Sequence, residues 1–312
     1  MTGPVPRIAL TVALVLAVGA AALWAQGGTA ALLAWAMEGQ RTAQAAMAGA
    51  LRSLRAGEAG ALAGLLGLAF TYGVLHAVGP GHGKLLIGGY GAATQVPLGR
   101  LAAIGLLASL GQATVAVVLV HGGIAVLDWG RADVVGLGEG ALTTASTAAI
   151  GAIGLWLAWR GARGLARLLP RPVPALRPAP QGAATGHDPA ACASCGHRHG
   201  PDPAEVARLT GWREGAALIG AIAIRPCTGA LFLLVLTWRM DITAAGIAGA
   251  YVMGLGTALV TVAVAGLSVL ARDGARMWAG RLGGLRPLGP MLELGVGLLV
   301  VLAAVQALRL GL

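Results

Sequence analysis

Two histidines flank a helix-breaking stretch at the end of an apolar run. The stretch is HAVGPGHGK, residues 76–84. Pro80 lacks an amide donor, and Gly81 and Gly83 tolerate backbone angles that other residues avoid, so we expect the helix to open over Gly79–Gly83. In an intact helix His76 and His82 would lie on opposite sides, whereas a break lets the two imidazoles converge. Since imidazole nitrogen binds Ni(II), Co(II), Cu(II) and Zn(II), the stretch predicts a transition-metal site.

The lysine that ends this stretch needs its own explanation. A fixed ammonium would repel a dication, so Lys84 should either reach toward the cytoplasmic membrane surface or pair with a carbonyl at the break. The structural alternative is a glycine-rich bend near the membrane interface, with histidines that only cap backbone groups. Two histidines around one break favour the metal site, because ionisable groups are costly to bury within a membrane span.

A second stretch, RPCTG at Arg225–Gly229, has the same form. Pro226 should open a helix, Cys227 and Thr228 offer a soft sulfur and a hydroxyl, and Arg225 is expected near an interface or paired. Setting this stretch against GPGHG also pairs LGQA at 110–113 with LGTA at 255–258. These matches predict inverted three-helix repeats, the arrangement of many secondary transporters, with a site between the two breaks. The predicted transport site is His76, His82, Cys227 and Thr228, and second-rank candidates in the following spans are Gln112, Thr114, Thr257 and Thr261.

A polar segment between the two halves holds a compact group of metal ligands. It contains Cys192, Cys195, His197 and His199, with His187 shortly before them. A C-x-x-C pair followed closely by H-x-H supplies enough thiolate and imidazole groups for one tetrahedral ion. Such a cysteine pair can also be a redox couple, and the loop can also stay unbound. The adjacent H-x-H favours metal binding.

The composition is that of a polytopic membrane protein. Hydrophobic residues make up 57% of the 312 residues and charged residues only 11%, against about 25% charged in soluble domains. Because the arginines lie between apolar runs, the net charge of +10 indicates membrane topology and no nucleic-acid partner. Apolar runs long enough to span a bilayer are predicted at 7–26, 60–78 (continuing past the break to about 92), 100–127, 140–160, 214–237, 243–271 and 288–310. The expected fold is therefore all-α, with about seven transmembrane helices, or six if the first is cleaved.

The arginines also predict which side of the membrane each loop faces. They follow the second, fourth and sixth spans, so the positive-inside rule makes these loops cytoplasmic. The expected organisation is an N-terminal span or signal anchor (1–26), an outer amphipathic connector (27–59), a first transmembrane repeat (60–160), a cytoplasmic Pro-rich, Cys/His metal-binding loop (161–213) and a second transmembrane repeat (214–312).

At its two breaks the chain resembles the NicO family of nickel/cobalt transporters. That family carries H-x-x-G-P-G-H-G-K in an early span and R-P-C-[ST]-G in a later one, and both motifs are complete here. The resemblance covers roughly residues 60–310 and implies secondary transport of Ni(II) and Co(II), with efflux for members that have a His-rich loop. The related uptake permeases carry H-A-x-D-A-D-H, and this chain has Gly79 and Gly81 in place of the two aspartates.

The expected function is therefore a metal carrier of the bacterial inner membrane, most simply a nickel/cobalt exporter. Ni(II) and Co(II) would be cargo, with no permanently bound cofactor and no catalytic residue. The alternatives are an uptake permease, an accessory membrane protein for metalloenzyme maturation, and a thiol-disulfide relay, which would need a second cysteine within the spans. Homo-oligomerisation stays open.

Overall fold

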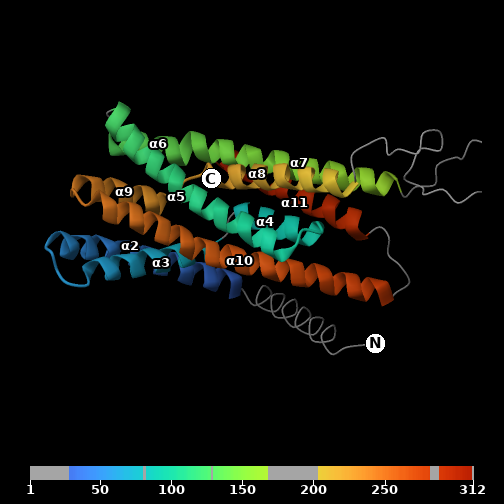
Figure 1. Ribbon diagram of the computed structural model, residues 1–312, viewed down its shortest axis with the longest axis horizontal. Coiled ribbons are helices and arrows are strands. Elements are labelled where there is room, and N and C mark those ends of the chain that lie inside the picture. The colour runs from blue at the N-terminus through green and yellow to red at the C-terminus, as the bar shows by residue number, and fades with distance from the viewer. Residues whose placement is uncertain (1–27, 80–81, 128, 168–202, 282–287, 311–312) are drawn as a thin grey trace, which may run out of the picture.

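The computed structural model of the protein describes residues 28–79, 82–127, 129–167, 203–281 and 288–310 (Figure 1). Within these ranges the chain is helical and has no β-strand, as the sequence predicts. The predicted first span at 7–26 and all five predicted metal ligands of the loop lie outside the described residues.

Ten α-helices and one π-helical turn make up the described chain. They are α2 (Gly28–Arg55), α3 (Ala61–Val78), α4 (His82–Ala93), α5 (Leu98–Leu127), α6 (Arg131–Leu137), the π-helical turn Gly138–Leu142, α7 (Thr143–Ala166), α8 (Pro203–Ala223), α9 (Thr228–Arg239), α10 (Thr243–Arg281) and α11 (Leu288–Leu310). Among the described residues, five stretches are long and apolar enough to span a membrane, namely 61–78, 98–127, 132–166, 243–277 and 289–309. The pair α8–α9, bent by 60° at its break, makes a sixth if it is counted as one span.

Both predicted helix breaks are present, and both are shorter than predicted. Helix α3 ends at Val78 and helix α4 begins at His82, so the first break lies between these two residues, and Gly83 and Lys84 are helical. Helix α9 begins at Thr228, so the second break covers 224–227 and Gly229 is helical. One proline is enough to open each helix, because it removes the amide donor and disfavours helix at the residue before it. Gly83 and Gly229 then join the next helix.

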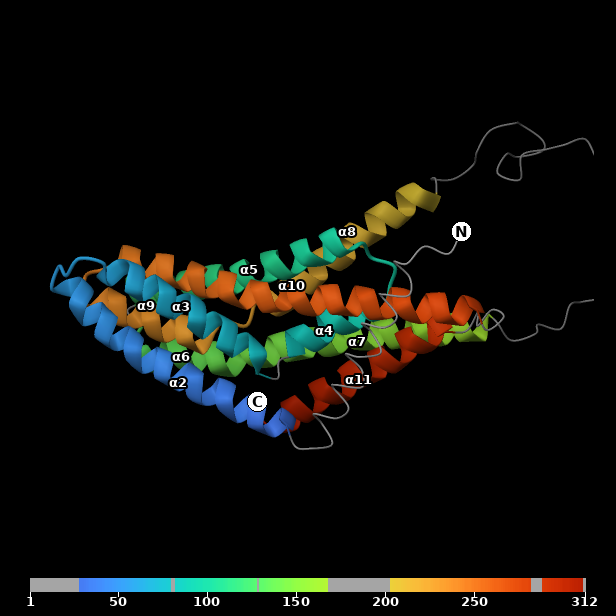
Figure 2. The ribbon, with the colours of Figure 1, turned by 90° about the horizontal axis from the view of Figure 1, so that it is seen from below.

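The two halves of the bundle run in opposite directions. In Figure 2 the pair α3–α4 runs from left to right and the pair α8–α9 from right to left, and α5 and α10 are likewise opposed. Each broken pair packs on the long helix of the other half: α3 packs on α10, and α8 packs on α5. Helices α7 and α11 pack against each other, as do α5 and α10.

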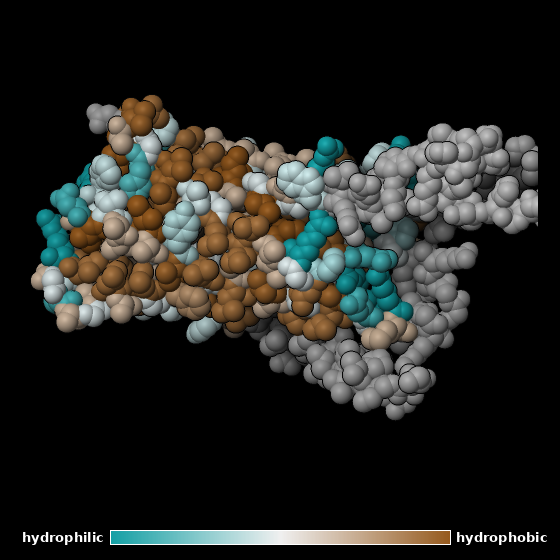
Figure 3. Space-filling model, in the orientation of Figure 1, coloured by the Kyte–Doolittle hydropathy of each residue, from teal (hydrophilic) through white to brown (hydrophobic). Residues whose placement is uncertain are grey.

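An apolar band covers the middle of one face of the bundle (Figure 3). Figure 3 shows hydrophobic residues over most of this face and hydrophilic residues toward both ends. The C-terminal end of α7 and of α10 and the N-terminal end of α8 lie together at the right-hand end in Figures 1 and 2. At 39 residues, α10 is about 58 Å long and must extend beyond a bilayer core of about 30 Å.

Helix α2 does not stand apart from the bundle. It packs along α3, with Ala43, Met47 and Leu51 buried in the same apolar core as Leu65 and Ala69 of α3. Its opposite side carries exposed charges, including the ion pair between Glu38 and Arg41. The segment predicted as an amphipathic connector (27–59) therefore contains a helix that packs against α3.

Helices α3 and α10 cross closely because glycine lies at the contact on both sides. A Cβ on Gly73 would be 2.9 Å from the carbonyl carbon of Met253, and one on Gly256 would be 3.0 Å from the amide nitrogen of Val74. Thr257 adds hydrogen bonds from its hydroxyl to the carbonyls of Gly73 at 3.3 Å and Met253 at 3.2 Å. Small residues of this kind let membrane helices approach through their backbones.

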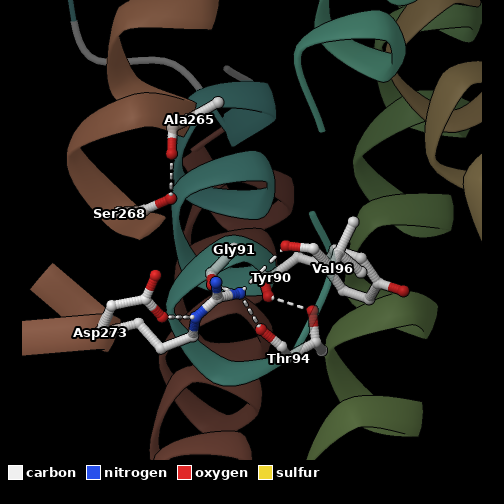
Figure 4. Close-up of polar contacts among 8 residues, drawn as sticks. Tyr90, Gly91, Thr94, Val96, Ala265, Ser268 and Asp273 are labelled. Atoms are coloured by element: carbon white, nitrogen blue, oxygen red, sulfur yellow. Dashed lines mark hydrogen bonds and ion pairs between the residues drawn. The ribbon is translucent and has the colours of Figure 1, made fainter. Parts of the chain in front are cut away.

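The far end of α4 is tied to α10 by Arg272 (Figure 4). The guanidinium Nη1 donates to the carbonyls of Gly91, Thr94 and Val96 at 3.3, 2.5 and 3.0 Å. Its Nε pairs with Asp273 at 2.9 Å. The last carbonyls of a helix have no partner within it, and Arg272, only 8% exposed, satisfies them here.

Candidate functional site

The two helix breaks adjoin each other. Gly83, in the first turn of α4, faces the last turn of α8, where a Cβ on Gly83 would lie 3.3 Å from Cγ2 of Ile222. The last turns of α3 face the start of α9, where a Cβ on Gly229 would overlap the ring of Tyr72. Segments separated by about 150 residues in the sequence thus meet in the middle of the bundle.

His76 and Cys227 come together at this meeting point. The imidazole of His76, in the last turn of α3, lies close enough to the Cys227 thiol for the two groups to interact. Cys227 is the N-cap residue of α9 and faces the backbone amides of Gly229 and Ala230. On its other side, the Cys227 thiol donates to the thioether sulfur of Met253 in α10 at 3.9 Å. Three side chains that can bind a metal through nitrogen or sulfur therefore converge from three helices.

The His76 ring is held by a stack of buried groups. Tyr72, one turn earlier on α3, lies parallel to it with ring centroids 5.9 Å apart and an interplanar angle of 9°. The Tyr72 hydroxyl in turn accepts a hydrogen bond of 3.0 Å from Nε2 of Gln40 on α2. Tyr72 is 1% exposed, so the imidazole keeps its orientation toward the thiol.

Polar side chains satisfy backbone carbonyls next to both breaks. The Lys84 ammonium donates to the carbonyls of Ala77 and Gly79. At the second break, Gln112 Nε2 donates to the carbonyl of Ile222 at 3.2 Å, and Ser146 Oγ donates to that of Ala221 at 2.6 Å. Lys84 thus takes the second of its two predicted roles. These protein donors are needed because no water is available within a bilayer to satisfy the backbone carbonyls at each break.

A cavity of about 650 Å³ opens beside the first break. Its walls include Val78, Gly79 and Lys84 together with apolar residues of α10 and α11, among them Val264 and Met291. Because Gly79 lines this cavity, the backbone at the first break has open space beside it.

The remaining predicted residues divide into three groups. Thr228 is exposed at the start of α9, and Gly229 lies under Tyr72. The second-rank threonines serve the packing of helices. Thr114 bonds Tyr251 at 3.0 Å, Thr261 bonds the carbonyl of Thr257 at 2.9 Å, and Thr257 lies at the glycine crossing. Pro80, Gly81 and the side chain of His82 lie outside what the structure describes.

The sequence did not predict a network of charged residues that joins α4, α7, α8 and α11. Arg160 of α7 pairs with Glu293 of α11 through two bonds of 3.0 Å and lies 3.8 Å from Glu214 of α8. The Tyr90 hydroxyl of α4 donates to Glu214. The network joins four helices. The available signal was the presence of Glu214 and Glu293 in otherwise apolar predicted spans, since such carboxylates need a partner.

Comparison with known proteins identifies the family. The profile described as NicO, high-affinity nickel-transport protein, matches residues 62–179, which include the first break. A curated protein of Haemophilus influenzae is 32% identical over 217 residues, which is 68% of this chain and 67% of that protein. The chain belongs to the NicO family. This relative is named provisionally as a nickel/cobalt efflux system.

Family membership and fold agree with each other. NicO is a family of transport proteins, as the sequence motifs predict, and the described helices are those of a multi-pass membrane protein. No solved structure matches the chain.

Proposed function

We propose that this NicO protein exports Ni(II) and Co(II) across the inner membrane, with the ion passing between its two broken helices. The observation that carries the proposal is the contact of His76 with Cys227, because it joins one break to the other through two metal ligands. His82, on the first turn of α4, and Thr228, on the first turn of α9, complete the proposed ligand set. Imidazole and thiolate suit both ions.

Alternating access would come from the two halves moving against each other. The opposed directions of α3–α4 and α8–α9 support an inverted repeat, and in such carriers the site lies where the repeats meet. The network around Arg160 joins α4, α7, α8 and α11 on one side of the breaks. We infer that the network around Arg160 closes its side of the protein when the metal site is open to the opposite side of the membrane.

The loop at 168–202 is proposed as a collecting arm on the cytoplasmic side. It connects α7 to α8 at the arginine-rich end, which the positive-inside rule makes cytoplasmic. Cys192, Cys195, His197, His199 and His187 would bind metal there and pass it to His76 and His82. A metal delivered from the cytoplasm is exported, and the name of the Haemophilus influenzae relative supports this direction.

Proton exchange is the proposed energy source, because an imidazole releases its metal when it is protonated. The test is Ni(II) movement in vesicles with and without an imposed pH gradient. Transport that ignores the gradient would remove this part of the proposal.

The function is tested by measuring intracellular Ni(II) and Co(II) in metal-loaded cells that express the wild type, His82→Ala or Cys227→Ala. Export predicts less metal with the wild type and the control level with either variant. More metal with the wild type would make the protein an uptake permease. Equal metal in all three would leave the accessory role in metalloenzyme maturation.

A further inference from the structure

A further potential ligand lies beside the proposed site, and no sequence motif includes it. Met253 of α10 is 1% exposed, and its thioether sulfur is 3.9 Å from the Cys227 thiol. We propose that His76, Cys227 and Met253 form one soft-donor site, which accepts the monovalent ion Cu(I) in addition to the divalent cargo. This inference rests on the proposed function, because it extends the ligand set of the same site.

The separation of the two sulfurs suits a shared ion. Metal–sulfur bonds are about 2.3 Å long, so two sulfurs 3.9 Å apart would subtend an angle of about 115° at a common ion. That angle lies between the tetrahedral and trigonal values. The His76 imidazole interacts with the same Cys227 thiol, so one nitrogen and two sulfurs are gathered around Cys227.

The donor types favour a soft ion. Thiolate and thioether ligands select Cu(I), whereas carboxylate and carbonyl oxygens suit harder cations. The groups whose charge acts on His76 include the Cys227 thiol, the Lys84 ammonium and the Arg225 guanidinium. No group of three or more His, Cys, Asp or Glu side chains in the described ranges could hold a metal, so Met253 is what completes a trio.

The charges around the site also favour a monovalent ion. One thiolate neutralises a monovalent ion but leaves a divalent ion with one uncompensated charge. Lys84 and Arg225 add further positive charge nearby, and burial of net charge is costly. The site as built therefore holds Cu(I) at lower cost than it holds a dication.

The test measures Cu(I) binding by the purified full-length chain under anaerobic conditions against a chromogenic Cu(I) chelator. Cys192→Ser and Cys195→Ser are present in every sample, so that the loop thiols do not contribute. Met253→Leu keeps the volume of the side chain and should weaken Cu(I) binding at least about ten-fold, equivalent to about 1.4 kcal/mol. Met47→Leu, at a methionine equally buried in the same core, should bind as the parent does.

X-ray absorption of the Cu(I)-loaded parent provides a second measurement that does not depend on a variant. Two sulfur neighbours and one nitrogen are expected, and a single sulfur or unchanged affinity in Met253→Leu would overturn the inference. If the parent moves no Ni(II) but binds Cu(I) through Met253, the proposed function fails and this inference stands.

Discussion

Replacing Gly73 with alanine should force α3 away from α10 at the point where the two helices support the site. The new Cβ would lie 2.9 Å from the carbonyl carbon and 3.2 Å from the Cα of Met253. Carbon atoms pack at about 3.5–4.0 Å, so the helices must separate by roughly 0.5–1 Å. Both contacts are with backbone atoms, so no side-chain rotation can relieve them.

The magnitude follows from a comparison with a second glycine on the same helix. A Cβ on Gly67 meets nothing within 4 Å, so Gly67→Ala should gain about 0.5–1 kcal/mol of helix stability. Overpacking at Gly73 should cost about 1–3 kcal/mol, so the two variants should differ by roughly 1.5–4 kcal/mol.

Thermal unfolding of the purified full-length chain in detergent measures this difference, and Ni(II) transport measures its consequence. His76 lies one turn beyond Gly73, so Gly73→Ala should move the imidazole relative to Cys227 and lower transport, whereas Gly67→Ala should transport normally. Equal stability of the two variants would show that the close crossing of α3 and α10 is not what positions the site.

Three further substitutions test the partners that fix the broken helices. Arg272→Met should destabilise the chain by at least about 1.5–3 kcal/mol, the value of one charge-assisted hydrogen bond, while Arg276→Met at an exposed position of α10 should have little effect on the unfolding temperature. Lys84→Met should abolish transport because the carbonyls of Ala77 and Gly79 lose their donor, and Lys84→Arg should restore part of it; full activity of Lys84→Met would exclude this role. Arg160→Gln should lower the free energy of unfolding by about 1–2 kcal/mol, since the carboxylate partners of Arg160 are only partly exposed. Arg41→Gln is the control, because both side chains of its ion pair are more than 70% exposed. It should leave the unfolding temperature within experimental error.

Backbone chemistry made the helix breaks predictable from the sequence. A proline removes one donor wherever it stands, so Pro80 and Pro226 located both breaks without any knowledge of the packing. The ends of the breaks were harder to predict, because Gly83 and Gly229 are compatible with either a helix or a bend. Long apolar runs likewise predicted α5 and the membrane part of α10, since length and hydropathy alone decide whether a run can span a bilayer.

The parts of the site contributed by tertiary packing were missed. Met253 and Tyr72 are ordinary core residues by type, and only the glycine crossing brings Met253 next to Cys227. Gln40 lies on a helix that the sequence predicted as a connector, yet it holds the Tyr72 hydroxyl. Thr114 and Thr261 were weighed as ligands because of their oxygen atoms, and they form hydrogen bonds within or between helices instead.

Ni(II) flux through purified protein in liposomes tests the central claim, that metal crosses where the two broken helices meet. His76→Phe keeps a ring that can stack on Tyr72 but removes the nitrogen that faces Cys227. His121→Phe is the matched control, because His121 lies on α5 with its ring against Trp238. The account predicts loss of flux in His76→Phe and wild-type flux in His121→Phe. Wild-type flux in His76→Phe would contradict it.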